Sequence, residues 1–410
     1  MTERADSRSS RGPGLPGQPN GWSPVLVAGI GMTPVGEHWD VSLRNLALDA
    51  ISAALEDAGG LRPDALYVAN MLAPALSGQS HLGALLADFA GLRGIEATTV
   101  EAAGASGGVA ARQAYLAVAS GAVEVALVLG VEKVTDKDSG QVEAALATAS
   151  DADYEAIQGV TAGAQAALLM RRYFHEHRAP QDALAGFSLV AHQNAVSNPN
   201  AMFRKAISLE QYSNAPMVSD PLNTYDAAPM ADGAAALILA RAATLLPPDG
   251  RPAVEIAGSA VATAAMAVHD LPDPLGLPAG AASAEAALER AASQVEQVDL
   301  FELHDRFSIF AALSLEAAGF AERGAGWLLA KQAEIALDGR IPICTYGGSK
   351  ARGEPGAATG IYQLAEAVSQ LQGRAGKNQV AGASIALVQC LGGSGATAAT
   401  HVLRRMANGT

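Results

Sequence analysis

The chain has 410 residues and a net charge of −14; half of its residues are hydrophobic and only 5% are aromatic. The acidic balance argues against nucleic acid as the main partner, and no apolar run is long enough for a membrane-spanning helix. Two cysteines, Cys344 and Cys390, are too few for a disulfide framework, so we expect a reducing, cytoplasmic compartment.

Strands and helices alternate through the first part of the chain. Residues 1–22 are rich in Arg, Ser, Gly and Pro, and we expect a disordered N-terminal extension there. Apolar runs bounded by Gly predict strands, and helical periodicity predicts helices between them. The expected strands lie in 24–36, 65–71, 97–103 and 123–134, and the expected helices in 42–59, 80–91 and 108–120. This alternation predicts a largely parallel sheet covered on both faces.

The same order of elements returns in the second part of the chain, which indicates a weak internal duplication. Strands are expected in 253–263, 298–308 and 383–405, and helices in 283–295, 309–320 and the later part of 344–373. The boundary falls in the Pro-rich stretch 245–252. We therefore expect an N-terminal half over 23–245 and a C-terminal half over 252–410.

One stretch, residues 131–220, fits neither copy. It is polar and carries several basic residues although the chain is acidic. We interpret it as an insertion of the N-terminal half that lies over the active face.

Polar residues occur where three of the predicted strands end. A Gly-rich turn at Gly104 leads directly into a helix, a geometry that displays a nucleophile or binds an anion, yet its only hydroxyl is that of Ser106. His304 stands at the end of a second strand. Glu354 and Cys390 lie in two further Gly-rich turns. Because ligands bind beyond the carboxyl ends of strands in α/β sheets, we expect these turns to form one site.

Five motifs resemble those of the thiolase superfamily, above all its archaeal and sterol-carrier-protein-type members. They are EAAGASGG (101–108), MADGAAALILA (230–240), ELHDRFS (302–308), GGSKARGEPGAATG (347–360) and CLGGSGATAA (390–399). The resemblance covers roughly residues 24 to 406. It implies two fused βαβαβαββ halves in a five-layer α/β/α/β/α arrangement, a loop region that holds coenzyme A, and a homodimer.

Two departures from the family pattern concern the nucleophile and its base. Family members carry the nucleophilic Cys where this chain has Gly104, and they read Gly-His-Pro where this chain has Glu354 in GEP. A glycine cannot form an acyl-enzyme. Ser106 is two residues away, and for it we favour a packing or capping role.

Other residues of the family site are retained. By resemblance, His304 holds the thioester oxygen, and Cys390 moves a proton at the α-carbon. Sterol-carrier-type members often take that Cys from the third position of the HDxF motif, where this chain has Arg306. The alternatives are a helix-capping role for His304 and a buried structural role for Cys390.

The remaining site predictions concern the substrate. We expect Gly104, Gly393 and Tyr346 to border the acyl pocket, although Tyr346 also fits core packing. Arg204 and Lys205 are either solvated or neighbours of the coenzyme A phosphates. We expect coenzyme A only as part of the substrate, and no tightly bound cofactor. The HEH sequence at 175–177 is a weak zinc pattern, so no metal is expected.

Three classes of function follow from these features. The first is an acyl-CoA enzyme that makes or breaks a C–C bond by an aldol route, with Glu354 as a base whose pKa is raised by desolvation. Thiolase-like aldolases of this kind carry Tyr in place of His304 and Glu354, and they work with a small zinc-ribbon/OB-fold partner. The second is a conventional acetyl-CoA acyltransferase, if Gly104 replaces a Cys. The third is a non-catalytic acyl-CoA-binding subunit.

Overall fold

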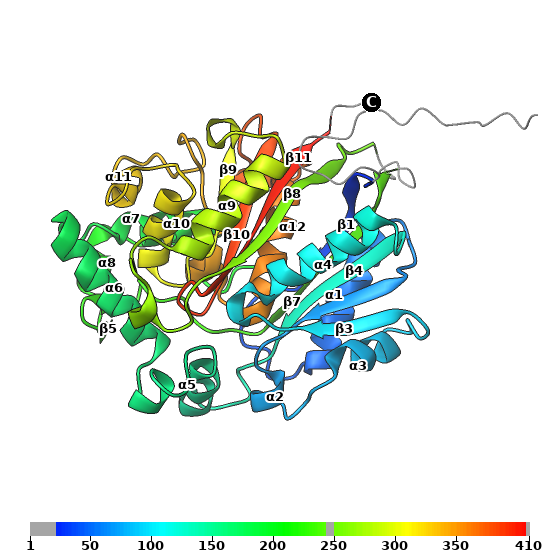
Figure 1. Cartoon of the computed structure of the whole chain (residues 1–410), viewed down its shortest axis with the longest axis horizontal. Coiled ribbons are helices and arrows are strands. Elements are labelled where there is room, and N and C mark those ends of the chain that lie inside the picture. The colour runs from blue at the N-terminus through cyan, green and yellow to red at the C-terminus, as the bar shows by residue number, and fades with distance from the viewer. Residues whose placement is uncertain (1–21, 243–249, 407–410) are drawn as a thin grey trace, which may run out of the picture.

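The computed structural model describes residues 22–242 and 250–406, and within them nine strands form one mixed sheet (Figure 1). The strand order is β3-β2-β4-β7-β1-β8-β11-β10-β9. The strands are β1 (Val25–Met32), β2 (Ala65–Ala69), β3 (Glu96–Val100), β4 (Val125–Glu132), β7 (Gly233–Arg241), β8 (Val254–Thr263), β9 (Leu300–Leu303), β10 (Ile385–Gly392) and β11 (Thr397–Arg405).

The sheet consists of two halves with the same strand pattern. In the first half β2 pairs in parallel with β3 and β4, and β4, β7 and β1 follow as antiparallel neighbours. In the second half β9 and β10 are parallel, and β10, β11 and β8 are antiparallel neighbours. Ile343 forms an isolated parallel bridge with Phe301 of β9. It thus occupies the place beside β9 that β3 occupies beside β2 in the first half. The halves join where Leu26 of β1 pairs with Glu255 of β8, so the two sheets are continuous.

The helices form layers outside and between the two half-sheets. Helices α1 (Leu43–Asp57) and α3 (Leu82–Phe89) pack on the outer face of the first half, and α9 (Pro278–Arg290) packs on that of the second. Helices α4 (Ser106–Ser120) and α12 (Thr359–Leu371) contact each other and strands of both halves. Every residue of α12 is buried. These contacts produce the five layers that the family resemblance implies.

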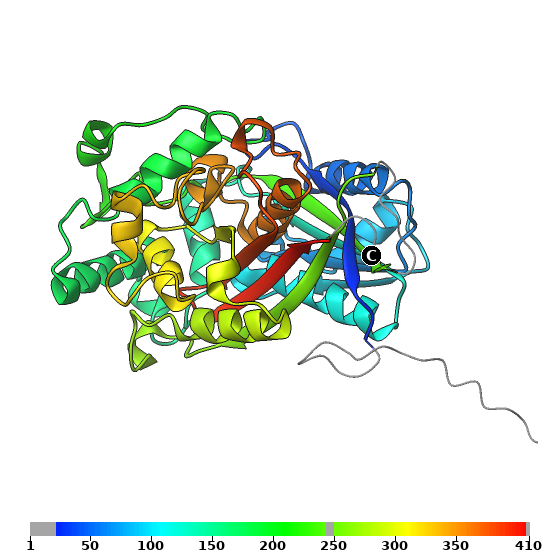
Figure 2. The same cartoon turned by 90° about the horizontal axis from the view of Figure 1, so that it is seen from above.

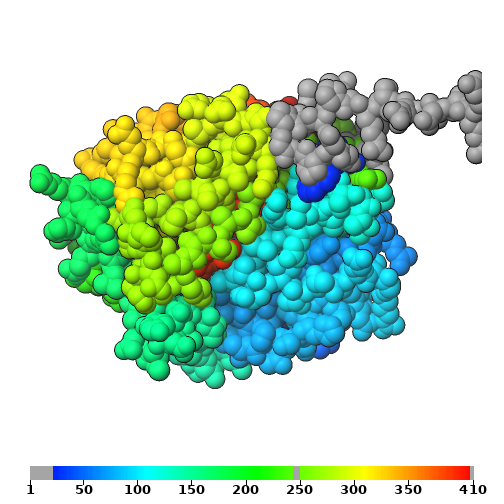
Figure 3. Space-filling view, viewed as in Figure 1, coloured from blue at the N-terminus to red at the C-terminus, as the bar shows by residue number. Residues whose placement is uncertain are grey.

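The segment predicted as an insertion folds into four α-helices and connecting loops, and a small hairpin begins at its end. The helices are α5 (Ser139–Ala147), α6 (Ala162–His177), α7 (Ala185–Ala195) and α8 (Leu209–Ser213), and the hairpin pairs β5 (Met217–Ser219) with β6 (Leu222–Asn223). Buried side chains of α6 and α7 share a core with α10 (Ser308–Ala317) and α11 (Gly326–Lys331). Figures 2 and 3 show this green segment against the yellow part of the second half. The insertion therefore packs on the C-terminal half although it belongs to the N-terminal half in sequence.

Two strands end inside the stretches predicted for them, and two predictions fall outside the described residues. Within 298–308, which was predicted as a strand running into a polar tip, β9 ends at Leu303, the chain leaves the sheet at His304, and α10 begins at Ser308. Within 24–36, which was predicted as a strand followed by a turn, β1 ends at Met32. The disorder predicted for 1–22 concerns residues that, up to 21, lie outside the described ranges, and so does most of the boundary in 245–252.

Candidate active site

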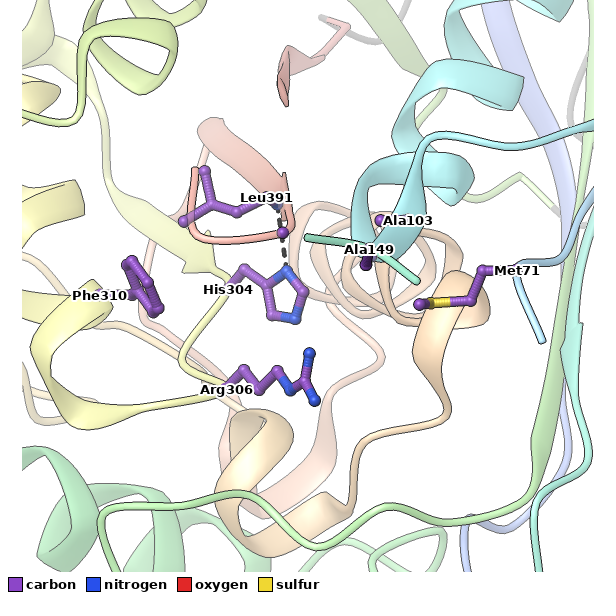
Figure 4. Close-up of a pocket in the computed structure, with 9 residues that line it drawn as sticks. Met71, Ala103, Ala149, His304, Arg306, Phe310 and Leu391 are labelled. Atoms are coloured by element: carbon purple, nitrogen blue, oxygen red, sulfur yellow. Dashed lines mark hydrogen bonds between the residues drawn. The ribbon is translucent and has the colours of Figure 1, made fainter. Parts of the chain in front are cut away.

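A small cavity of about 10 Å³ lies where four strands end, and Figure 4 shows the side chains around it. This volume is near the lower limit for one water molecule. The loops after β2, β3, β9 and β10 and the segment after α5 form its wall. The lining residues are Met71, Ala103, Gly104, Ala149, His304, Arg306, Phe310, Leu391 and Gly393. An acyl group enters only if flexible lining side chains such as Met71 and Arg306 move.

Gly104 lies in a short 3₁₀ turn, Ala103–Ala105, directly before α4. A Cβ atom at this position would lie 2.6 Å from the carbonyl oxygen of Leu391 and 2.9 Å from Cε1 of His304. The first contact is with backbone, so a side chain fits here only if the chain shifts. The His304 ring and the Leu391 backbone occupy the space beside Gly104, so the missing side chain leaves no extra room for an acyl chain.

Ser106, the hydroxyl of the same turn, is fully buried and does not line the cavity. Its Oγ accepts the N–H of Ala102 at 2.8 Å and donates to the carbonyl of Ala103 at 2.5 Å. The side chain therefore holds the turn together, in agreement with the structural role favoured from the sequence.

His304 is 3% exposed and has a partner at each ring nitrogen. Nδ1 lies 3.1 Å from the backbone nitrogen of Leu391 and accepts its N–H. Nε2 lies 3.3 Å from both carboxylate oxygens of Glu354. Since Nδ1 accepts, the proton of the neutral ring is on Nε2 and is donated to Glu354. Both ring nitrogens are thus engaged, so no N–H of this ring is free for a thioester oxygen.

Glu354 lies behind His304 and does not line the cavity. It is 1% exposed, and it accepts a 2.9 Å hydrogen bond from the hydroxyl of Thr359. Burial by itself would raise the pKa of Glu354, but four effects lower it to about 2: the charge that His304 carries when protonated, hydrogen bonds with His304 and with Ser349, and the positive charge of Arg306. The raised pKa expected from the sequence is wrong, because partners for the charged form outweigh desolvation.

Cys390 is buried on β10 and faces α4 rather than the cavity. Its Sγ lies 3.6 Å from the carbonyl oxygen of Ala105 and packs against Gly108. Burial raises the pKa of this thiol to about 12. This position gives no support to a proton-transfer role and agrees with the alternative of a small buried side chain. Cys344 is buried as well, with its Sγ 3.6 Å from the carbonyl oxygen of Leu303.

Of the two remaining pocket predictions, Gly393 borders the cavity and Tyr346 does not. Gly393 has φ +60°, and a Cβ there would lie 2.9 Å from the carbonyl oxygen of Ala149. Tyr346 lies beside α12, where burial and the charge of Glu366 raise the pKa of its hydroxyl, while a hydrogen bond with Ser369 acts in the opposite direction. Tyr346 is half-buried and belongs to none of the core clusters of the described residues, so the structure supports neither the pocket role nor core packing.

Sequence reasoning did not place Met71, Ala149, Arg306 or Phe310 at the site. Met71 ends the stretch predicted as the strand 65–71, so the rule that sites form at strand ends was a signal for it. Arg306 was noted only as a departure from the family motif. Ala149 comes from the insertion and Phe310 from the first turn of α10, and nothing in their local sequence marks them.

A second, larger cavity of about 620 Å³ lies behind the wall of the site. Lys205 lines it, whereas Arg204 is exposed beside it and does not. The segment 227–229 borders this cavity on one side. On its other side the same segment is hydrogen-bonded to backbone groups of the site. The N–H of Ala228 donates to the carbonyl oxygen of Arg306 at 2.8 Å, and the carbonyl oxygen of Pro229 accepts the N–H of Glu354 at 2.9 Å.

No group of three or more His, Cys, Asp or Glu within the described ranges is arranged to hold a metal ion. His177 of the HEH sequence instead stacks edge-on against Tyr173, with ring centroids 4.8 Å apart. Among the same residues, no helix is long and apolar enough to cross a membrane.

The fold and the site together define a duplicated α/β protein with one pocket at the strand ends of both halves. The family model of the thiolase N-terminal domain matches residues 25–243, and that of the thiolase C-terminal domain-like family matches residues 260–405. The chain belongs to the thiolase family, as the motifs predicted. The predicted boundary in 245–252 lies between the two matched ranges, but these ranges do not test its position.

Three known proteins illustrate what the chain is similar to. It is 43% identical over 383 residues to an acetyl-CoA acetyltransferase of Methanothermobacter thermautotrophicus, covering 93% of this chain and 99% of the relative. It is 29% identical over 360 residues to the benzoylsuccinyl-CoA thiolase subunit BbsB of Thauera aromatica, covering 87% and 91%. A solved structure described as Ltp2-ChsH2(DUF35) aldolase matches with a TM-score of 0.79 and 26% identity, covering 93% of this chain and 98% of the other.

Proposed function

We propose that this thiolase-like protein acts on acyl-CoA and makes or breaks a C–C bond next to the thioester by an aldol route, without an acyl-enzyme. One observation carries the proposal: none of the residues that line the cavity has a hydroxyl or thiol side chain. Position 104, where the family resemblance places the nucleophile, has no side chain and no space for one. An aldol cleavage needs an acid–base group and a stabilised enolate, but no nucleophile.

The reaction balances without a further reactant. A base takes the proton of the β-hydroxyl group, the C–O bond becomes a carbonyl, and the Cα–Cβ bond breaks. Its electron pair forms the thioester enolate, which then takes a proton at Cα. The products are an aldehyde or ketone and a shortened acyl-CoA, and the reverse steps join them.

We assign the proton transfer to His304 and not to Glu354. A carboxylate with a pKa of about 2 is a weak base at neutral pH, and Glu354 lies behind the cavity wall. His304 lines the cavity, and imidazole is the side chain that most often exchanges protons in catalysis. Glu354 is then a positioning residue, because its carboxylate accepts the Nε2–H and stabilises the imidazolium that forms.

The basic nitrogen in this scheme is Nδ1, which lies on the Gly104 side of the ring. Nδ1 accepts the N–H of Leu391 in the present structure, so the substrate hydroxyl must replace that bond. The released N–H of Leu391 lies at the cavity and becomes a donor for the thioester oxygen. This backbone group takes the role that the sequence assigned to His304.

The coenzyme A part of the substrate is proposed to use the 620 Å³ cavity. Its size suits a large ligand, it borders the segment 227–229 at the back of the site, and Lys205 is available there for a phosphate. Arg204, which is exposed nearby, supplies a second positive charge at the entrance.

We further propose a homodimer and a small DUF35-type partner. The description of the aldolase structure includes such a partner, and BbsB is described as a subunit. The outer strand β3 has mostly exposed residues at the edge of the sheet, which suits pairing between chains.

The second candidate is a conventional acyltransferase, which the 43% identity to an acetyl-CoA acetyltransferase favours. Intact-mass measurement after incubation with acetyl-CoA separates the two functions. The aldol route predicts no mass gain, and it predicts a carbonyl product together with a shortened acyl-CoA from a β-hydroxyacyl-CoA, detected by liquid chromatography and mass spectrometry. A stoichiometric acetyl group on Cys390, Cys344 or Ser106 would overturn the proposal.

A further inference from the structure

Arg306 brings a positive charge into a pocket that is otherwise nearly apolar. Its side chain extends from the loop after β9 and is directed into the pocket, like that of His304 (Figure 4). These two are the only lining residues with polar side chains. Within residues 22–242 and 250–406, the Arg306 guanidinium carbon lies 5.3 Å from the centroid of the Phe307 ring, and the guanidinium forms no hydrogen bond or ion pair.

Unlike Arg306, which is partly exposed, the buried cations of the described chain each have a specific oxygen partner. They are Lys133, 2.9 Å from Asp232; Arg352, 2.6 Å from Glu366; and Lys350, 2.7 Å from the carbonyl oxygen of Asp226. A ligand that fills the pocket would remove the partly exposed Arg306 guanidinium from water. This removal is costly unless the ligand brings an acceptor, because arginine does not lose its proton. Arg306 therefore has hydrogen-bond donors directed at the cavity that no protein group of the described ranges accepts.

Carboxylates act on Arg306 only from a distance. Glu354 and the exposed Glu143 of α5 oppose the lowering of the Arg306 pKa by burial, but neither forms a hydrogen bond with it. Glu354 is already bound by His304 and Thr359. A ligand that excludes water from this pocket must consequently bring the acceptor for the guanidinium.

We propose that Arg306 binds a carboxylate group carried by the acyl chain of the substrate. The planar guanidinium matches a carboxylate with two parallel hydrogen bonds, and the negative charge compensates its own. The thioester oxygen is the other acceptor that an acyl-CoA brings to this pocket, but it is uncharged before reaction and leaves the cation uncompensated. This inference adds the chemical class of the acyl chain to the proposed function. It rests on one part of that proposal, the binding of acyl-CoA, and not on the aldol route.

Two thioesters with four-carbon acyl chains test the inference. Succinyl-CoA ends in a carboxylate and butyryl-CoA in a methyl group, and binding of each to the full-length chain is measured by isothermal titration calorimetry. We expect succinyl-CoA to bind the wild type at least about 10-fold more tightly, the low end for a charged hydrogen-bonded pair. Arg306→Gln should remove this preference by weakening succinyl-CoA alone. Arg93→Gln, at a side chain that is 81% exposed, is the matched control and should keep it.

Each other outcome decides against the inference. Equal binding of the two thioesters by the wild type would overturn it, and so would a preference that survives in Arg306→Gln. Equal weakening of both thioesters in that variant would place Arg306 at the thioester or coenzyme A part. Thermal unfolding of the variants shows whether they are folded. The proposed function fails separately: if succinyl-CoA is preferred but no β-hydroxyacyl-CoA is cleaved, the carboxylate site stands and the aldol route does not.

Discussion

The two Gly-rich turns that precede the central helices occupy equivalent places in the duplicated halves, yet they contribute differently to the site. The turn before α4 contributes Ala103 and Gly104 to the cavity wall, so it supplies only backbone atoms and one methyl group. The turn before α12 carries Glu354, and the strand beside it leads to His304 and Arg306. The first half thus shapes the pocket, and the second half supplies its ionisable groups. The duplication preserves the fold while the chemistry becomes concentrated in one copy.

The largest expected effect is on turnover when the second half loses its proton acceptor. His304→Gln keeps an amide near the N–H of Leu391 but cannot accept a proton at neutral pH, so we expect cleavage of a β-hydroxyacyl-CoA to fall roughly 10²–10⁴-fold. The rate is measured by release of the carbonyl product. Unchanged turnover would remove His304 from the reaction and would return the base to Glu354.

Glu354→Gln should lower turnover less, by about 10–100-fold, because it removes the group that orients His304 and leaves the imidazole in place. Acyl-CoA binding should stay nearly intact. A loss as large as that of His304→Gln, together with a shifted pH profile for the rate, would indicate that Glu354 itself takes the proton.

The same variant tests the pKa of Glu354 through stability. The carboxyl has a pKa of about 2 in the folded chain against an ordinary value of 4.5, so its ionised form stabilises the fold above pH 4.5. This contribution is lost as the pH falls toward 2. The free energy of unfolding of the wild type relative to Glu354→Gln, from urea titrations, should therefore shrink over that range. A difference that grows on acidification would show that the pKa is raised instead.

A side chain in the first turn should cost stability. Gly104→Ala places a Cβ 2.6 Å from the backbone oxygen of Leu391, and we expect the free energy of unfolding to fall by about 1–3 kcal/mol. Gly36→Ala is the matched control, since a Cβ there meets no atom within 4 Å, and it should be neutral. Equal stability of the two variants would show that the turn has room. Gly104→Cys would then be a fair test of restored acyl transfer, measured by intact mass.

The smallest effect is expected at Cys390. Cys390→Ser keeps a donor toward the carbonyl of Ala105 and changes nothing at the cavity wall, so turnover should change by less than about threefold. A drop of 100-fold or more would restore the proton-transfer role that the family resemblance assigned to this thiol, and would require the β10 region to rearrange when substrate binds.

The duplicated α/β architecture could be predicted from the sequence because its signals are local. Apolar runs such as that of β4, Gly-rich turns and helical periodicity each depend on a few neighbouring residues, and the family motifs repeat at strand ends. Strand ends also predicted one site from the turns of Gly104, His304, Glu354 and Cys390; Gly104 and His304 line the cavity, whereas Glu354 and Cys390 do not. The sequence also predicted His304 at the polar tip of its strand, and β9 ends one residue earlier, at Leu303.

The sequence by itself determined the family, the loss of a nucleophile at Gly104 and the residues available for chemistry. Only the tertiary structure decided what those residues do. Glu354 was expected to have a raised pKa from burial, but the approach of His304 and Arg306 from β9 reverses the shift. Cys390 and Gly393 are three positions apart on one chain, yet one faces α4 and the other the cavity, because β10 ends between them. A pKa and a side-chain direction depend on atoms distant in sequence, which no local pattern records.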